Sequence, residues 1–356
     1  MRIERIGFHG RGCLLLGAGA TRGASFIEKD GFPLPFPPLD ADFFTQIQRM
    51  SLPANRNIVR QLLRFTVDEF GVGFTLTMEQ FFTQVEALPQ VFQELRISRG
   101  QTYRTPEKAM LLFKQALAGL FSEALLREDP PGTRRHKTCG YHNRLVGTLD
   151  ANDAVISFNY DCVLEESLRL NCKVWSPTES YHLGTVNGDL DYWRYQVPGA
   201  GRPITNVLPV LKMHGSMNWR RHGTRVTLTR EPYDLSGEYE IVPPQWQKDV
   251  LRADAPYRRI WQEARRRLEL TRCLIVAGYS VPATDLLAQT LLRCRNRPAG
   301  KTLGQNYLEV LAIANPDRDS RRHLLKLFSN SSINEHTQVL VFDSLKQCAE
   351  YLVPVS

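Results

Sequence analysis

The chain has 356 residues and a formal net charge of +8, and hydrophobic residues make up 42% of it and charged residues 23%. This length is enough for one large α/β domain with an insertion, or for two modest domains, and the composition is that of a folded globular protein. No run approaches the roughly 18 apolar residues of a membrane span, so we expect a cytoplasmic protein without membrane segments.

The positions of cysteine and arginine in the sequence indicate which metal sites and binding partners to expect. Seven cysteines are scattered along the chain without a Cys-x-x-C pair, so the sequence predicts no zinc clip and no redox motif. Arginine clusters in two short runs, at 220–225 and 258–267. These runs are compatible with binding of a nucleic acid or another acidic partner. They fit a solvated helix face or a contact between subunits equally well.

The first predicted element is a short strand, Cys13 to Leu16, that ends in a glycine turn. The turn Gly17-Ala18-Gly19-Ala20 follows it directly, and polar residues that could open a helix come next. Because the apolar stretch is only a few residues long and runs into this turn, the N-terminus fits a first strand and not a signal peptide.

A Pro-rich stretch and a helical region follow this first unit. Four prolines between 33 and 38 exclude regular structure there, and apolar residues recur with helical spacing from about 41 to 128. The segment 128–140 is polar and rich in turn residues, which indicates an exposed connection. We therefore expect a helical insertion at 41–139 between two parts, 1–40 and 140–356, of one α/β domain.

Alternation of strands and helices resumes after the insertion. Short β-rich runs occur at 154–158, 207–213, 273–277, 307–314 and 339–342, separated by helical patterns. This alternation predicts a doubly wound, Rossmann-like and mostly parallel sheet, whose first βα unit lies upstream of the helical insertion.

The glycine turn is the first candidate site. Backbone N–H groups at the start of a helix can hold a pyrophosphate, and the spacing Gly17-x-Gly19-x-x-x-Gly23 fits that use. The third glycine comes one residue later than in the dinucleotide-binding fingerprint, so a tight turn without a ligand explains the spacing equally well. Asp40 has the right distance for a ribose-binding carboxylate, but it follows the Pro-rich loop instead of a second strand.

Polar residues also follow two of the later strands, at the edge where doubly wound sheets bind their ligands. Asn159 and Asp161 come after the strand at 154–158, and either could instead cap the next helix. His214 ends the run at 207–213, and the small Gly215 leaves room for a ligand beside it. This position suits a general base, although a lone histidine is more often a hydrogen-bonded structural residue.

Small or polar residues close two further strands. Gly278-Tyr279-Ser280 follows the run at 273–277, and Asn315 follows the run at 307–314. Each is by itself a simple turn. Together they could line the ribose and adenine side of a nucleotide pocket.

In this order, these strand ends resemble the motifs of the sirtuin-like (silent information regulator type) NAD-consuming domain. The resemblance covers nearly the whole chain, apart from the helical insertion and the region 176–206. It implies NAD+ as the substrate, with Asn159, His214 and Asp161 at the bond that is cleaved. It places the following residues at the dinucleotide: Gly17, Ala18, Gly19, Ala20, Gly215, Gly278, Ser280 and Asn315.

Two departures from the deacylating sirtuins affect the expected activity. Those enzymes carry a four-cysteine zinc module between the catalytic histidine and the Gly-x-Ser strand, whereas 216–277 contains only Cys273, so we expect no zinc. The glycine turn continues as Thr21-Arg22-Gly23-Ala24-Ser25, which is similar to bacterial antiphage-defence members. That similarity implies an NAD+ hydrolase that acts by abortive infection.

Two alternatives stay open at this point: an NAD-dependent protein deacylase, and a non-catalytic subunit that binds nucleic acid or an ATPase. A hydrolase that depletes NAD+ must be held inactive until infection. We therefore expect a homo-oligomer or a separately encoded partner, for example a nucleic-acid-dependent ATPase.

Overall fold

The computed structural model describes residues 11–29, 35–95, 106–129, 133–196, 206–222, 225–242, 255–282, 285–296, 307–328 and 332–352. The N-terminal segment before residue 11 and part of the Pro-rich stretch, for which the sequence predicts no regular structure, lie outside the described residues.

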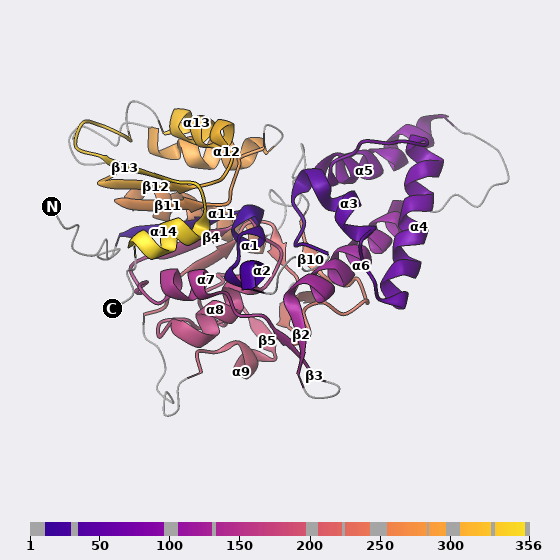
Figure 1. The fold of residues 1–356 in the computed structure, drawn as a ribbon, viewed down its shortest axis with the longest axis horizontal. Helices are drawn as coiled ribbons and strands as arrows, with labels where there is room; N and C mark the ends of the chain where they lie inside the picture. The colour runs from indigo at the N-terminus through magenta and orange to yellow at the C-terminus, as the bar shows by residue number, and fades with distance from the viewer. Residues whose placement is uncertain are drawn as a thin grey trace.

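A parallel six-stranded sheet forms the centre of the α/β part, with the strand order β13-β12-β11-β1-β4-β6 (Figure 1). Its strands are β1 (Gly12–Leu16), β4 (Ala154–Ser157), β6 (Val210–Lys212), β11 (Cys273–Ala277), β12 (Val310–Ala314) and β13 (Gln338–Phe342). Every residue of β1, β4 and β11 is buried, as expected for strands covered on both faces. The predicted Rossmann-like fold class is confirmed.

Helices cover both faces of this sheet (Figure 1). On one face α7 (Gly140–Val146) packs against α8 (Val163–Asn171) and α14 (Leu345–Leu352). On the other face α11 (Ala255–Leu270) packs against α12 (Leu286–Leu292) and the short η2 (Arg293–Asn296), and α13 (Arg318–Leu327) lies above β12 and β13 in the view. The buried residues of α14 show how the sequence directs this packing, because they recur at helical spacing: Leu345, Cys348, Ala349 and Leu352.

The strand order reverses between β1 and β11. From β1 the chain continues outward to β4 and β6, and it then returns to the other side of β1 as β11, β12 and β13. Leu16 at the end of β1 lies in register with Ala277 at the end of β11. The carboxyl ends of these two neighbours form the topological switch point, which is where open α/β sheets bind ligands.

The helical region between β1 and β4 contains η1 (Asp40–Asp42), α3 (Phe43–Ile47), α4 (Pro53–Phe70), α5 (Met78–Leu95) and α6 (Pro106–Leu125), and it stands beside the sheet in Figure 1. Proline at the first position of α4 and Gly71 with φ +88° after its end are typical helix boundaries. The helices pack through aromatic rings, with centroids 4.2 Å apart for Phe82 and Phe113 and 5.6 Å for Phe81 and Phe113.

The segment 128–140 differs from the exposed connection that we predicted. It contributes to an antiparallel hairpin, β2 (Leu126–Asp129) and β3 (Thr133–His136). The register places Glu128 opposite Arg134 and Arg127 opposite Arg135, and Arg135 forms a 2.9 Å ion pair with Asp129. Most of these residues are exposed, so the polar composition that suggested a loop is also compatible with a hairpin.

The helix predicted after the first glycine turn is present as α1 (Ala18–Arg22). Several other short elements were not predicted, among them the helices α2 (Ser25–Lys29) and α9 (Leu190–Trp193). A three-stranded sheet combines β5 (Val186–Gly188), β9 (Arg225–Leu228) and β8 (Trp219–His222), and β7 (Gly215–Ser216) pairs with β10 (Glu240–Ile241). Strands of two to four residues carry too little periodicity for recognition from sequence. Among the described helices, none has both the length and the apolar character that crossing a bilayer requires.

A buried ion pair connects β6 to α8 beneath the switch point. The side chains of Lys212 and Glu165 are fully buried, and Lys212 Nζ lies 3.0 Å from Glu165 Oε1. The same ammonium donates a hydrogen bond to the backbone carbonyl of Asp161 at 2.7 Å. Burial raises the pKa of the Glu165 carboxyl, and the ammonium of Lys212 opposes that rise. The pair therefore fixes the loop between β4 and α8.

We predict that Lys212→Met lowers the free energy of unfolding by about 3–5 kcal/mol, because it leaves the Glu165 carboxyl buried without its cation. Urea unfolding at neutral pH measures this change. The exposed Lys173 offers a matched control, and Lys173→Met should stay within about 0.5 kcal/mol of the wild type. Equal losses in the two variants would contradict a role for the buried pair.

Candidate functional site

The turns after β1 and β11 meet through their backbones. Gly17 N donates to Ala277 O at 3.0 Å, and Gly19 N donates to Gly278 O at 2.8 Å. A Cβ atom on Gly17 would lie 2.6 Å from Gly278 O, and one on Gly19 would lie 2.9 Å from Gly278 Cα. Glycine is needed here because two backbones approach more closely than side chains permit.

Gly278 is subject to the same constraint and to a second one. Its φ of +63° lies in the left-handed region, and an added Cβ would lie 1.9 Å from the amide nitrogen of Ala20. The glycine of the Gly-x-Ser motif is therefore explained by packing against the first turn.

The amides of the first turn are largely engaged within the protein. Besides Gly17 and Gly19, Ala20 N donates to Gly17 O at 2.9 Å. A pyrophosphate bound at this turn would need donors other than these three amides. Binding of the dinucleotide by Gly17, Ala18, Gly19 and Ala20 stays a prediction, and the contact with β11 accounts for the two glycines without it.

We predict that Gly278→Ala lowers the free energy of unfolding by about 4 kcal/mol or more, because the new methyl group collides with backbone atoms. Gly73→Ala is the matched control. Its φ is +82°, but nothing lies within 4 Å of an added Cβ, so only the conformational cost of roughly 1–2 kcal/mol is expected. Thermal or urea unfolding of both variants compares the two costs. Similar losses would show that φ alone, and not the contact between turns, requires glycine at 278.

Two of the predicted catalytic residues are connected through Thr21. The Thr21 hydroxyl donates to Asp161 Oδ2 at 2.8 Å and accepts a hydrogen bond from Asn159 Nδ2 at 3.2 Å. Asp161 Oδ1 also accepts from Val163 N at 3.0 Å, so Asp161 holds the first residue of α8 while it orients Thr21. Thr21 could not be selected from the sequence, because a threonine in a helical turn after a glycine motif carries no signal of its own.

The other end of the Asn159 side chain is a buried acceptor. Asn159 is buried, and its Oδ1 makes no hydrogen bond within the part of the chain that the structure describes. A buried acceptor without a donor is rare in native structures, since its desolvation is uncompensated. This oxygen is suited to accept a hydrogen bond from a hydroxyl group or a water molecule.

His214 lies beside a carboxylate from another strand end. It is buried, and its Nε2 is 3.6 Å from Asp285 Oδ2. Asp285 accepts from Ala288 N at 3.2 Å as the N-cap of α12, and its Oδ2 accepts from the Tyr279 hydroxyl at 3.2 Å. Asp285 could not be selected from the sequence. Its one signal is an aspartate before a helix, which is common at helix starts.

Aromatic stacking joins the ends of β4 and β11. The rings of Phe158 and Tyr279 are 4.2 Å apart and nearly parallel, at 6°. The His214 ring packs edge-on against Phe158 at 5.3 Å. Asn159 follows Phe158 directly in the sequence, and His214 packs against the Phe158 ring. Both residues are therefore next to Phe158, although they are 55 residues apart in the sequence.

The remaining predicted residues are placed differently. Asn315 Nδ2 donates to Tyr279 O at 3.3 Å and its Oδ1 accepts from Asp317 N at 2.9 Å, so both ends of this amide are engaged. Ser280 is exposed. The space beside Gly215 is filled, because an added Cβ would lie 2.1 Å from Glu240 O, and Gly215 therefore permits the pairing of β7 with β10.

The helical region contributes carboxylates near the same site. Asp40 Oδ1 accepts from Glu79 N at 2.8 Å, and burial raises the pKa of the Asp40 carboxyl. Burial and then the nearby carboxylates of Glu79, Asp285 and Asp40 raise the pKa of Tyr160 well above its usual value. Asp40 thus lies near the loop after β4, but in η1 and not at the end of a second strand.

All seven cysteines are buried free thiols. Within the described residues, no three His, Cys, Asp or Glu side chains gather in a way that could hold a metal ion. Comparison with known protein families gives no matching family model, and no curated protein matches the sequence. Fold and site together define a Rossmann-like α/β protein with polar side chains gathered at its switch point.

Proposed function

We propose that the chain is an NAD+ hydrolase that cleaves the bond between nicotinamide and ribose. The observation that carries the proposal is a buried asparagine with a free acceptor directly after Phe158, whose ring contacts a buried histidine beside a carboxylate. The resemblance of the same residues to the sirtuin-like motifs supports NAD+ as the substrate.

The reaction makes modest demands on the protein. The bond between C1′ of the ribose and the nicotinamide nitrogen breaks, and the electron pair leaves with a neutral nicotinamide. A water oxygen bonds to C1′, its proton passes to a base, and ADP-ribose results. Because the transition state is oxocarbenium-like and the leaving group needs no acid, positioning the ribose and the water is the main task.

The three catalytic candidates then have distinct roles. Asn159 Oδ1 accepts a hydrogen bond from the attacking water or a ribose hydroxyl. His214 takes the proton, and Asp285 stabilises the imidazolium that forms. Asp161 orients Asn159 through the Thr21 hydroxyl.

The dinucleotide would extend from this point along the carboxyl edge of the sheet. We assign to it the turn Gly17 to Ala20, with Gly215 and Gly278, whose lack of side chains lets the protein's own backbones meet at this edge, and Ser280 and Asn315 on the adenosine side. Since the Asn315 amide is engaged, its contribution is to hold the turn at Tyr279, and the exposed Ser280 is the better candidate for direct contact.

A protein deacylase is the second candidate, because it would use the same groups on a ribose hydroxyl. The shortage of cysteines between 216 and 277 speaks against it. A deacylase consumes little NAD+ without an acylated lysine, whereas a hydrolase needs only water.

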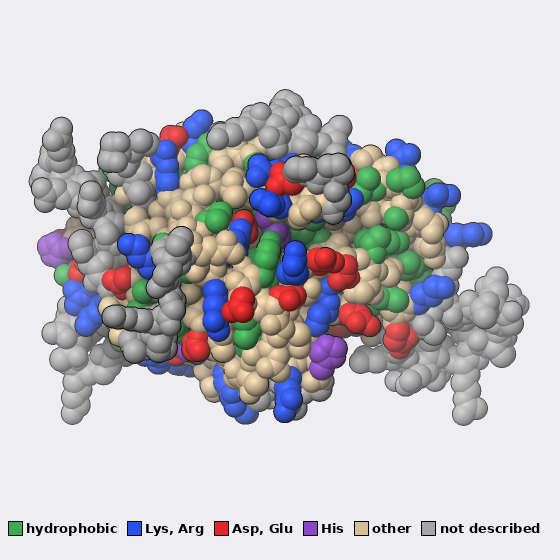
Figure 2. Space-filling view, turned by 90° about the horizontal axis from the view of Figure 1, so that it is seen from below, with side chains coloured by type: hydrophobic (Ala, Val, Ile, Leu, Met, Phe, Trp, Pro, Cys, Tyr) green, Lys and Arg blue, Asp and Glu red, His purple; other side chains and the backbone are tan. Residues whose placement is uncertain are grey.

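A non-catalytic subunit that binds nucleic acid gains little support from the arginine runs. Arg266 and Arg267 both pair with Glu263, and Arg265 pairs with Glu269 along the exposed face of α11. Figure 2 likewise shows Lys and Arg interspersed with Asp and Glu on the face that carries α9 and the β2–β3 hairpin. Charges balanced in this way favour a solvated surface over a polyanion track.

The biological setting that we propose is antiviral defence in the bacterial cytoplasm by abortive infection. An enzyme that depletes NAD+ needs restraint, so we infer a homo-oligomer or a separately encoded partner, such as a nucleic-acid-dependent ATPase. Light scattering of the purified chain, alone and with candidate partners, tests this inference, and a fully active lone monomer would refute it.

We predict that Asn159→Ala and His214→Ala each lower nicotinamide release from NAD+ by more than about 100-fold while the protein stays folded. Chromatography of purified protein incubated with NAD+ alone measures the release, and circular dichroism checks the fold. His222→Ala, at an exposed histidine of β8, is the matched control and should keep wild-type turnover. Release that depends on an added acyl-lysine peptide would identify the deacylase instead.

We predict that Thr21→Val lowers the turnover number at least about tenfold, because valine keeps the volume of threonine but cannot bridge Asn159 and Asp161. Thr21→Ser retains the hydroxyl group and should restore most of the turnover. If valine and serine reduce turnover equally, the hydroxyl bridge does not position Asn159.

A further inference from the structure

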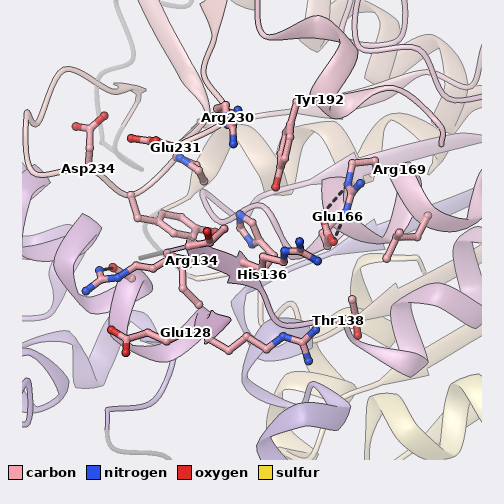
Figure 3. A pocket seen from close by; sticks show the side chains of 18 of the residues that line it. Glu128, Arg134, His136, Thr138, Glu166, Arg169, Tyr192, Arg230, Glu231 and Asp234 are labelled. Atoms are coloured by element: carbon pink, nitrogen blue, oxygen red, sulfur yellow. Dashed lines mark hydrogen bonds and ion pairs between the residues drawn. The ribbon is translucent and has the colours of Figure 1, made fainter. Parts of the chain in front are cut away.

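A separate cavity lies between the β2–β3 hairpin, the second half of α8, α9 and the segment 230–234 (Figure 3). Its volume is about 1210 Å³, and none of the residues assigned above to the NAD+ site lines it. Ligand pockets for small molecules typically measure about 300–1,000 Å³, so this cavity has room for a ligand of nucleotide size.

His136 is an unsatisfied polar group in the lining of this cavity. It is 4% exposed, and neither of its ring nitrogens has a hydrogen-bond partner among the described residues. Figure 3 shows it among the lining side chains, with Arg230 and Tyr192 on one side and Glu128 and Thr138 on the other. The rings of Tyr233 and Trp193, at 5.3 Å and 5.9 Å, hold the imidazole in place.

The protonation state of His136 defines what it can bind. Burial lowers its pKa to about 4, so the ring is neutral at physiological pH. A neutral imidazole presents one donor and one acceptor. Leaving the donor and the acceptor without hydrogen bonds in a buried site is costly, and a ligand with polar groups removes that cost.

Two arginines of the lining have no carboxylate partner among the described residues. Arg134 donates to the Ser122 hydroxyl at 2.9 Å, and Arg230 lies over the Tyr192 ring at 5.7 Å. Arg169 lies over the same ring at 5.3 Å, but it is paired with Glu166 at 2.6 Å. Guanidinium groups that are not neutralised suit the planar, bidentate recognition of phosphate.

The lining also holds four carboxylates, and two of them are neutralised. Glu166 is paired with Arg169, and Asp234 is paired with Arg220 at 2.7 Å. Glu128 and Glu231 are exposed, where water screens their charge and where they could accept hydrogen bonds from sugar hydroxyls. The cavity thus combines sites for an anion, for hydroxyl groups and for an aromatic ring.

We propose that this cavity is a second binding site, which takes a nucleotide. Arg134 and Arg230 bind its phosphate, and His136 hydrogen-bonds its base beside Tyr192 and Tyr233. The site is joined to the loop after β4, because Cys162 N, which follows Asp161, donates to the Tyr233 hydroxyl at 2.9 Å. The proposal concerns binding and does not depend on the hydrolase activity.

Isothermal titration calorimetry with AMP tests the proposal on the full chain. We expect wild-type protein to bind AMP, and the double variant Arg134→Ala/Arg230→Ala to bind it at least about tenfold more weakly, a difference of about 1.4 kcal/mol. His136→Phe, which keeps a ring but removes both nitrogens, should also weaken the binding of AMP. Because AMP is the adenosine half of NAD+, Ser280→Tyr, at the residue assigned to the adenosine side of the NAD+ site, is included and should leave this binding unchanged.

Arg225→Ala is the matched control, since Arg225 is an exposed arginine of β9 that does not line the cavity, and it should bind AMP like the wild type. Adenosine and inorganic phosphate, titrated separately, should each bind more weakly than AMP. The proposal is overturned if the wild type does not bind AMP at about 1 mM. It is also overturned if the Arg134→Ala/Arg230→Ala variant binds AMP normally, or if adenosine binds as tightly as AMP.

Discussion

The contact between the turns after β1 and β11 is the constraint on which the rest of the candidate site depends. Gly17 and Gly19 donate to carbonyls of the β11 end, and Gly278 leaves room for the amide of Ala20. Because no side chain separates these backbones, the first and fourth strands of the sheet end at one place. Thr21 and Tyr279, which follow these glycines, are thereby brought to the residues after β4 and β6.

Around this contact, buried polar groups determine where the reactive side chains lie. The ammonium of Lys212 holds the carbonyl of Asp161, whose carboxylate holds Thr21. Thr21 in turn fixes one end of Asn159 and leaves the other end as a buried acceptor. Such a network is costly to bury unless nearly every group is satisfied, so the exception at Asn159 is informative about where a ligand would bind.

The sheet could be predicted because its central strands are continuous apolar runs, and Asn159, Asp161, His214 and Asn315 could be selected because each follows such a run. The hairpin of β2 and β3 could not be predicted, because its residues are mostly polar and exposed and show no alternation of apolar and polar positions. Likewise Asp285 and His136 carry no local signal. The importance of each arises from residues distant in sequence, which no periodicity reveals.

The position of β1 in the sheet affects when the protein can fold during synthesis. Gly12 N donates to Asp153, 141 residues further along the chain, and the whole of β1 pairs with β11 in the last third of the sequence. Contacts this distant are slow to form, and the pairing of β1 with β11 cannot exist while β11 is still on the ribosome. A growing chain therefore carries its first glycine turn without the partner that shapes it, and only a nearly complete polypeptide can assemble the site.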